Sequence, residues 1–264
     1  MYYAVDSALE WRMQFDQTDL DAGVIDSWEE LARFEAGECY EQQWNQAVFG
    51  PAASTATFGV NVQSRYGDSL QIAPALLADH RARSGGLSLS PGAQTRLFRD
   101  GELIKELDEL NLFLDVPAES ARYRVEFELD RPLPAELSTH VELAWEFVSA
   151  SSGDESVALP ISYVRFLPEL DQDSAAQKGA KLVLPIRVEA QPEAEVSGPE
   201  SLTVEVSYDD GQSWSEATVE GEGAAWSAQL EHPQQSGFVS LRAVAIDADD
   251  NVVETTIIRA YRLQ

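Results

Sequence analysis

The segment Thr203–Trp214 is the feature of this sequence that most constrains the fold. Apolar residues alternate with polar ones from Val204 to Tyr208, which is the period of a strand with one buried face. Asp209-Asp210-Gly211 follows at once. Aspartate side chains accept backbone hydrogen bonds and glycine adopts positive φ without a Cβ clash, so this triplet favours a tight turn. The segment predicts a hairpin typical of extracellular β-modules rather than a catalytic centre.

The same two-residue period recurs earlier in the chain. Arg122–Leu129 and Val141–Phe147 each place apolar residues on one face and charged or small residues on the other. Leu97–Ile104 carries Asp100-Gly101 between apolar residues, the strongest short-range signal for a hairpin. These patterns predict an all-β chain.

One segment leaves helix and strand open. Ser27–Glu30 has the spacing of a helix capping box, with Leu31 and Phe34 at helical spacing behind it. The alternative is a strand through Phe34, a turn at Ala36-Gly37 and a second strand into Trp44.

A polar stretch divides the chain. Pro168–Lys181 carries no apolar alternation and is rich in turn-forming and charged residues. We therefore expect two β-sandwich domains in tandem, of jelly-roll or Ig-like type: an accessory domain over 1–170 and an Ig- or fibronectin-III-like domain over 180–264. The polar link predicts that they unfold separately. The strands expected in the second domain are Leu182–Glu189, Leu202–Tyr208, Ala225–Leu230, Phe238–Ile246 and Val252–Arg259.

Charge excludes one class of partner. The 264 residues contain 18 Lys and Arg against 46 Asp and Glu, a formal net charge of −28. A surface this acidic repels polyanions, so we expect no nucleic acid partner. Its plain interpretation is a solvated acidic surface that attracts cations diffusely.

The cysteine content and the N-terminal sequence bear on whether the protein is secreted. Cys39 is the single cysteine, so no intramolecular disulfide forms, and its acidic neighbours make it a poor nucleophile. A domain this large does not depend on disulfides, so secretion stays compatible with the sequence. Met1–Asp6 shows no signal peptide, and no apolar run reaches the roughly 18 residues of a membrane span. For an extracellular protein the signal is expected on a longer precursor.

Catalytic motifs are not found. His80, His140 and His232 have no metal-binding spacing, and there is no Gly-x-Ser-x-Gly or Ser-x-x-Lys motif. Asp79-His80 with a remote serine would need a spatial triad that adjacent side chains on a strand disfavour. We expect no enzyme activity and no cofactor.

Two acidic turns are weak calcium candidates. One contains Asp209 and Asp210; the other contains Asp247, Asp249 and Asn251, spaced like the start of a calcium-binding loop. Ile258 stands where that loop needs a bidentate glutamate. A structural turn is the favoured interpretation of both.

Two of the six tryptophans are candidates for an exposed ligand platform. Trp11 and Trp28 lie in irregular, polar sequence, whereas Trp145 and Trp226 lie in apolar strands and are expected in the core. Core packing remains the favoured alternative for Trp11 and Trp28 as well.

An ordered set of motifs carries a family resemblance. Most of residues 40–264 resembles the C-terminal region of large secreted actinobacterial subtilisin-like serine peptidases, and the likeness weakens before Trp44. The motifs are, in order, Trp44–Pro51, Arg65–Leu70, Leu97–Ile104, Thr203–Trp214, Gly237–Asp247 and Ile257–Tyr261.

The resemblance implies a non-catalytic role. In that family the catalytic Asp, His and Ser belong to an upstream domain, with the serine in a Gly-Thr-Ser-Met-Ala motif that this sequence lacks. The implied function is an accessory region that packs on or spaces out the peptidase domain, in cis or as a separate chain, and holds a protein or polysaccharide substrate. The alternative is a stand-alone carbohydrate- or cell-surface-binding β-sandwich module.

Overall fold

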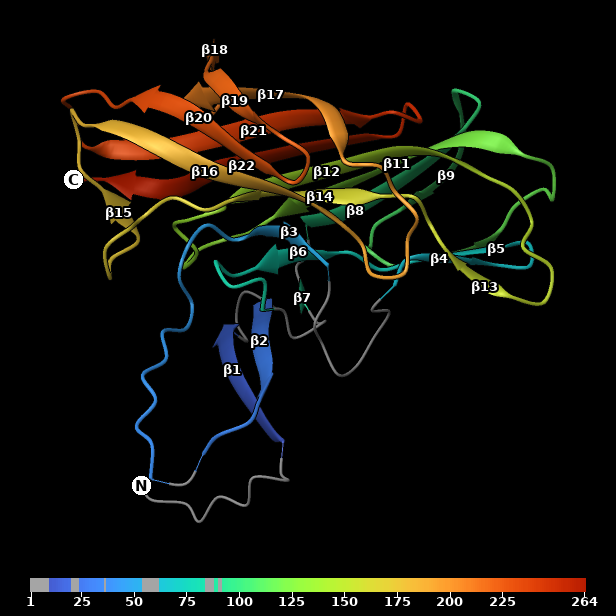
Figure 1. Ribbon diagram of the computed structural model, residues 1–264, viewed down its shortest axis with the longest axis horizontal. Coiled ribbons are helices and arrows are strands. Elements are labelled where there is room, and N and C mark those ends of the chain that lie inside the picture. The colour runs from blue at the N-terminus through green and yellow to red at the C-terminus, as the bar shows by residue number, and fades with distance from the viewer. Residues whose placement is uncertain (1–9, 20–23, 36, 54–61, 84–87, 90–91) are drawn as a thin grey trace.

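Every regular element that the structure describes is a β-strand. The computed structural model describes residues 10–19, 24–35, 37–53, 62–83, 88–89 and 92–264 (Figure 1). All strand pairs among these residues are antiparallel except one short parallel pair. The predicted all-β fold, with two β-sandwich halves in tandem, is confirmed.

One sheet of nine described strands runs through both halves of the molecule. It receives strands from both halves of the chain, because β22 pairs with β21 on one side and β12 on the other. In spatial order its strands are β18 (Ser215–Glu216), β17 (Pro199–Ser207), β21 (Gly237–Asp247), β22 (Val252–Leu263), β12 (His140–Ser149), β11 (Ala121–Asp130), β8 (Gly92–Arg99) and β9 (Glu102–Leu107), with β15 (Ala175–Ala176) parallel to β22.

Two four-stranded sheets complete the sandwiches at opposite ends of the molecule (Figure 1). The first comprises β10 (Leu112–Asp115), β5 (Ser69–Ile72), β4 (Ser64–Tyr66) and β13 (Ser156–Ala158). The second comprises β14 (Ser162–Phe166), β16 (Lys181–Ala190), β20 (Ala225–Glu231) and β19 (Thr218–Glu222). Two smaller sheets are formed by β1 (Trp11–Asp19), β2 (Val24–Ala32) and β7 (Ser88–Leu89), and by β3 (Gly50–Ala52) and β6 (Ala75–Ala78).

The core follows the alternation in the sequence. On β11 every second residue from Ala121 to Leu129 is buried. Cross-strand partners face the same way, so Val125 pairs with Trp145 and Tyr123 with Phe147 on the buried face. Burying one such large apolar side chain stabilises the fold by about 1.5–3 kcal/mol. The strands predicted over 122–129 and 141–147 are therefore confirmed.

The predicted boundary at Pro168–Lys181 does not interrupt the sheets. Val164 of β14 pairs with Val188 of β16, and Leu143 of β12 pairs with Thr255 of β22. Buried residues from both halves belong to one hydrophobic cluster. Since separating the halves would break these ladders, the geometry favours one cooperative unfolding transition over the two that the polar link predicts.

The short helix considered at Ser27–Phe34 is wrong. Residues Val24–Ala32 form β2, which pairs along its length with β1, and Phe15 lies opposite Trp28. Tertiary pairing thus overrides the local capping signal. The alternative strand is confirmed as far as Ala32, but no strand follows into Trp44. Of the turn expected at residues 36–37, Ala36 lies outside the described residues.

The hairpin predicted at Asp100-Gly101 is confirmed. It joins β8 to β9, and its two central residues have φ of 52° and 83°. Positive φ at both positions matches the right-handed twist of the flanking strands, which explains why aspartate and glycine occupy them.

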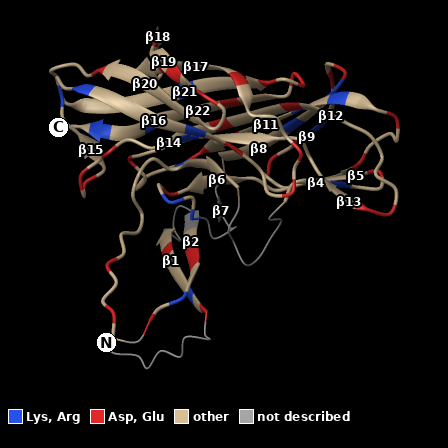
Figure 2. Cartoon of the chain, in the orientation of Figure 1, with Lys and Arg blue, Asp and Glu red and all other residues tan. Residues whose placement is uncertain are grey.

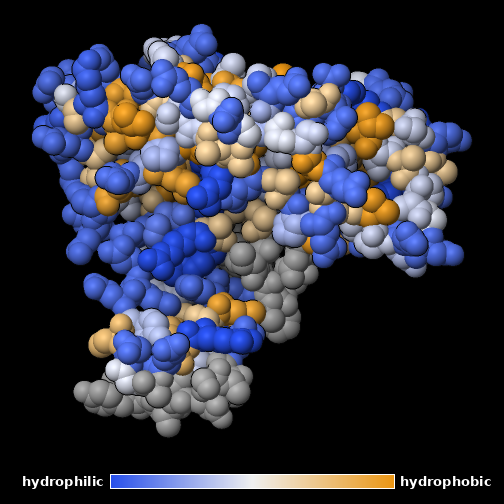
Figure 3. Space-filling view, viewed as in Figure 1, coloured by the Kyte–Doolittle hydropathy of each residue, from blue (hydrophilic) through white to orange (hydrophobic). Residues whose placement is uncertain are grey.

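Acidic residues lie all around the molecule, many of them in turns (Figure 2). In the space-filling view, hydrophobic residues form small groups among hydrophilic ones rather than one large apolar area (Figure 3). Among the described residues we find no helix with the length and apolar character that crossing a membrane requires.

Candidate functional site

The Asp209 carboxylate closes its own turn. Oδ1 accepts hydrogen bonds from Ser207 Oγ at 2.7 Å and from the Ser213 N–H at 2.8 Å, and Oδ2 accepts one from Ser213 Oγ at 2.5 Å. These bonds stabilise the charged form and lower the pKa of Asp209 to about 2. Both carboxylate oxygens already accept hydrogen bonds within the turn, so the main role of this side chain is to stabilise the turn.

Asp210 is engaged elsewhere, by an arginine of β22. Its two oxygens accept hydrogen bonds from Arg259 Nε at 2.9 Å and Nη2 at 2.7 Å, a bidentate pair. This pairing lowers the pKa of Asp210. The adjacent Gly211 has φ of +82°, and a Cβ there would lie 2.8 Å from Ile258 Cδ1. The turn therefore requires glycine and folds tightly against β22.

Asp247 organises the second acidic turn in the same manner. Its Oδ1 accepts the N–H groups of Asp249 at 2.9 Å and Asn251 at 2.8 Å, while Oδ2 accepts Asn251 Nδ2 at 2.9 Å. Asp247 itself is buried. The spacing that resembles a calcium loop is thus explained by a turn that the aspartate holds through backbone hydrogen bonds.

The two acidic turns cannot act on one ion. Pro199, at the start of β17, pairs with Asp247, whereas Asp209 follows the end of β17. A strand of nine residues separates them by roughly 30 Å. Among the described residues, no group of three His, Cys, Asp or Glu side chains is arranged to hold a metal ion. Weak calcium binding at either turn stays a prediction.

Trp28 is not an exposed platform, which corrects the sequence-based hypothesis. Its side chain is 0% exposed, and its indole N–H donates to the Leu77 carbonyl at 3.1 Å. Its ring packs between Phe15 and Phe49, with centroid separations of 5.9 Å and 5.6 Å. The indole anchors the β1–β2 hairpin, which projects from the body of the molecule in Figure 1. The residues next to Trp28 in the sequence are polar and do not indicate this core position. The residues that bury Trp28 come from distant segments of the chain.

Trp11 lies at the start of β1, opposite Ala32, and is half-buried. The structure does not bring it together with Trp28, because the two residues lie at different levels of the same hairpin. A paired tryptophan platform is therefore not formed.

His140 is held between two carboxylates. Nδ1 lies 2.7 Å from Asp130 Oδ1 and Nε2 lies 3.1 Å from Glu142 Oε1. Hydrogen bonds to Glu142, then to Asp130, raise the pKa of His140 to about 9. The imidazole is therefore charged at neutral pH, which makes it a poor general base.

His232 forms a cluster with the buried Tyr261 and the half-buried Tyr208 that sequence reasoning missed. Nδ1 lies 3.2 Å from Tyr208 Oη and Nε2 lies 3.5 Å from Tyr261 Oη. Burial lowers the pKa of His232 and raises that of Tyr208 to about 12, so all three groups are neutral at pH 7. A cavity of about 380 Å³ adjoins His232, with Asp171 and Glu169 on its wall. The sequence separation of the three residues left no local motif to reveal them.

Asp79 and His80 do not form the acid–base pair of a triad. Asp79 Oδ2 is 2.6 Å from Arg83 Nη2 but 3.9 Å from His80 Nδ1. Arg83 also stacks on Trp44, with its guanidinium carbon 3.9 Å from the ring centroid. The aspartate serves as partner to a buried arginine, and burial lowers the pKa of His80.

Another cleft among the described residues is lined mainly by polar side chains. It has a volume of about 450 Å³ and lies where the 45–49, 131–137 and 172–174 segments meet the C-terminal strand. Arg262 on its wall is ion-paired to Glu136, and Arg131 Nη1 donates to the Leu137 carbonyl at 2.7 Å. The described residues that line it include no His, Cys or Lys. These residues can hold polar groups.

Comparison with known proteins adds little. No family model matches the chain, and no curated protein is similar to it. Among solved structures, a chimeric titin Z1Z2-Z1Z2 tandem functionalized with a GRGDS peptide from fibronectin is similar at 14% identity, with a TM-score of 0.26. The match covers 76% of this chain and 93% of that chain. A match with so low a TM-score says nothing further about the fold, which is described from the strand pairing alone.

Proposed function

We propose that this chain is a non-catalytic accessory region of an extracellular subtilisin-like serine peptidase. It packs on or spaces out the catalytic domain and helps to hold a substrate or a cell-surface polymer. The resemblance of residues 40–264 motivates this proposal. Residues that carry the resemblance shape the fold: Phe49 packs on Trp28, Asp100-Gly101 and Gly211 make turns, and Tyr261 is in the core.

The observation that carries the proposal is the set of partners around the imidazoles. His140 lies between two carboxylates, His232 between two tyrosines, and His80 beside the Asp79–Arg83 pair. Acyl transfer needs a serine or cysteine within hydrogen-bond reach of its base. None of the described contacts of these imidazoles is to such a group.

Activity-based labelling tests this proposal. The chain is incubated with a fluorophosphonate serine probe and with casein, beside an active subtilisin as a positive control. We expect neither labelling nor casein cleavage. Labelling that disappears when one serine is changed to alanine would contradict a non-catalytic role.

The arrangement with a peptidase is tested at the gene. We expect an upstream open reading frame, or the same frame extended, to encode Gly-Thr-Ser-Met-Ala. A peptidase domain expressed with this chain should then co-purify with it. A gene with neither arrangement would favour the second candidate function, a stand-alone carbohydrate- or surface-binding module. One exposed sheet face favours that candidate specifically.

A further inference from the structure

The outer face of the β10-β5-β4-β13 sheet presents two exposed aromatic rings. Phe113 of β10 is 58% exposed and Tyr66 of β4 is 50% exposed. Phe113 pairs with Gln71, and Tyr66 pairs with Ser69, so all four side chains lie on one face. We call this surface the aromatic face; its members are Tyr66, Ser69, Gln71, Phe113, Asp115, Ser156 and Ala158, while Ser64 lies on the same side of the sheet but is buried.

Polar side chains occupy the space between the rings. Gln71 and Ser69 lie on the central strand β5, and Asp115 extends the row of Ser69. Within the described part of the chain, these three side chains have no hydrogen-bonding or ion-pairing partner. An amide, a hydroxyl and a carboxylate together offer both donors and acceptors to a ligand.

The aromatic face is braced from beneath by a buried arginine. Arg65 of β4 points to the opposite side of the sheet from Tyr66, and its Nε donates to the Gly67 carbonyl at 2.9 Å. Its Nη2 donates to the carbonyls of Val116 at 3.2 Å and Pro117 at 3.0 Å. These bonds tie the β4–β5 turn to the end of β10. The strands that carry the two rings are therefore held in fixed relation, and such preorganisation lowers the cost of binding.

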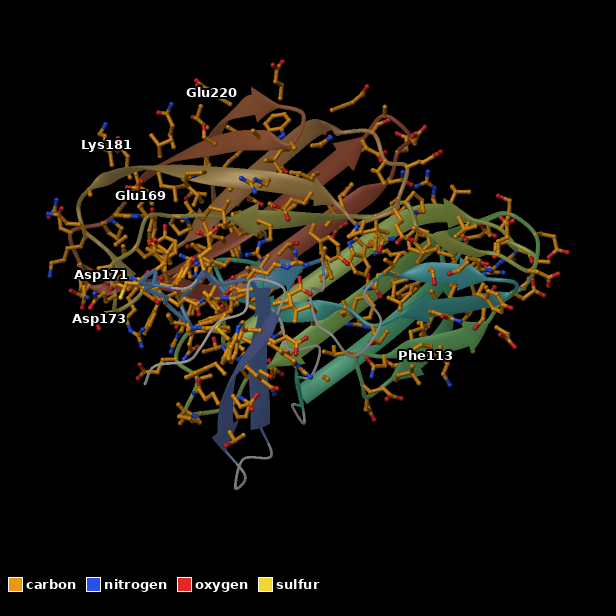
Figure 4. All side chains as sticks on the ribbon, turned by 60° about the horizontal axis from the view of Figure 1, so that its bottom comes forward. Phe113, Glu169, Asp171, Asp173, Lys181 and Glu220 are labelled. Atoms are coloured by element: carbon orange, nitrogen blue, oxygen red, sulfur yellow. The ribbon has the colours of Figure 1, made fainter. Side chains whose placement is uncertain are left out.

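Spacing and charge indicate what such a face can bind. Strand geometry places Tyr66 and Phe113 roughly 12 Å apart, two strands across and one row along. Asp115 is the only charged member, although the chain as a whole carries −28. A protein partner would meet an apolar centre with a polar rim, whereas here the centre is polar and the rings flank it. Phe113 also lies at the opposite end of the molecule from Asp171 and Asp173 (Figure 4).

We propose that the aromatic face is a binding site for an uncharged polysaccharide. A sugar ring presents flat C–H surfaces that pack on aromatic faces and hydroxyl groups that bond to amide and carboxylate oxygens. Sugar units stack on Tyr66 and Phe113 while hydroxyls between them bond to Gln71 and Asp115. The distance between the rings requires several linked units. This site deepens the proposed binding role of the accessory region and rests on it.

The test measures retention of the full chain on polysaccharides. Probes are insoluble cellulose and chitin, and soluble xylan and mixed-linkage β-glucan in affinity electrophoresis, with polyanionic pectate as a contrast. We expect retention by at least one neutral polysaccharide, insensitive to salt up to about 1 M because no ion pair is involved. Oligosaccharides of that polymer should bind more tightly as they lengthen.

Variants locate the site. Phe113→Ala and Tyr66→Ala should each weaken binding about tenfold, and Gln71→Ala should weaken it less. Tyr40→Ala is the matched control, since Tyr40 is also 50% exposed but lies elsewhere. Melting curves confirm that each variant is folded; if one alanine variant fails to fold, Phe113→Ser or Tyr66→Ser replaces it.

Three results would overturn the assignment. They are retention by none of the neutral polysaccharides, retention that the Phe113 and Tyr66 variants leave unchanged, and loss of peptidase-domain binding in those same variants. The last would show a protein-docking face. Failure of the proposed function appears separately, as serine-probe labelling of the chain, so the two proposals fail in different experiments.

Discussion

Two exposed sheet faces of this molecule contrast in how their polar side chains are used. On the outer face of the nine-stranded sheet, Arg124 donates to both oxygens of Glu254, at 2.7 and 3.0 Å, and to Glu126 at 2.7 Å. We call this surface the ion-paired face; it also carries the pairs Arg242–Glu205 and Arg96–Glu128. On the aromatic face, by contrast, Gln71, Ser69 and Asp115 have no partner among the described residues.

The difference shows which of the two faces has polar side chains available to bind a ligand. The ion-paired face satisfies its own charges, and pairing raises the pKa of Arg124, so a ligand there must break existing bonds. The aromatic face keeps its polar groups free and places its one buried arginine below the sheet. A binding surface benefits when its strands are held rigidly from the inner side of the sheet and its outer polar side chains are free to bind a ligand.

The largest expected effect comes from removing the brace of the aromatic face. Arg65→Met removes a buried guanidinium; it leaves the carbonyls of Val116 and Pro117 without their side-chain donor and the Gly67 carbonyl with only the Ser152 N–H, so we expect a loss of about 3 kcal/mol or more in unfolding free energy. Urea denaturation measures it. Arg124→Met is the matched change on the ion-paired face, where exposed ion pairs contribute about 0–1 kcal/mol. Equal losses for the two variants would remove the contrast.

The next effect concerns the turn that folds over the end of the ion-paired face. Gly211→Val places a β-branched residue at φ of +82° and a Cβ 2.8 Å from Ile258 Cδ1. Strain and crowding should destabilise the protein by roughly 1–3 kcal/mol. Gly101→Val, at similar φ but with nothing within 4 Å of the new Cβ, separates strain from crowding. Gly211→Val should therefore cost more than Gly101→Val in thermal denaturation.

The pH dependence of His140, at the edge of the ion-paired face, is a smaller effect. Its pKa is raised from 6.5 to about 9 in the folded chain, so its contribution is complete below pH 6.5 and is lost as pH rises through about 9. The side chain is 28% exposed and its carboxylate partners are more so, so we expect only about 1 kcal/mol. Stability of the wild type and of His140→Gln across pH 6 to 10 measures it. A difference between them that does not change with pH would contradict the assignment.

His232 gives the opposite sign and serves as the control. Burial lowers its pKa from 6.5, so its contribution is present above pH 6.5 and is lost as pH falls through the lowered folded value. NMR titration of the two imidazoles should therefore show one midpoint above and one below the ordinary value.

The sequence predicted the fold where the signal was local. Alternation gave the buried faces of β11 and β12, and Asp100-Gly101 and Gly211 gave turns whose positive φ the structure shows. It misjudged what depends on distant partners. Trp28 is buried because Phe49 and Leu77 contact it. The pairing of β12 with β22 across the two halves is likewise a contact between distant segments, and the separate unfolding of the halves stays a prediction.

The candidate sites show the same limit. For the Asp-x-Asp-x-Asn spacing at 247–251 the sequence favoured a structural turn and left weak calcium binding as the alternative; the structure shows a turn that Asp247 closes. Tyr66 and Phe113 lie in separate strands of irregular sequence, and only strand pairing through β5 places them on one face. No spacing rule along the chain could have brought them together.

The smallest expected effect is that of calcium on the acidic turns. Both oxygens of Asp247 and of Asp209 already accept hydrogen bonds from their turns, so calcium should gather diffusely around the −28 charge. Diffuse attraction is screened within a Debye length of roughly 8 Å at physiological salt, whereas direct oxygen ligands resist modest salt. At about 10⁻³ M calcium, the weak extracellular regime, we expect a small rise in melting temperature that magnesium reproduces and sodium chloride abolishes.

The calcium-induced change in melting temperature is compared among wild type, Asp247→Ala, Asp209→Ala and the exposed control Glu220→Gln. The change is used rather than the melting temperature itself because the two turn variants are destabilised without any ion. A calcium-selective, salt-resistant difference that either turn variant removes and Glu220→Gln retains would establish a bound ion at that turn, and would place a second ligand-binding surface on the same molecule as the aromatic face.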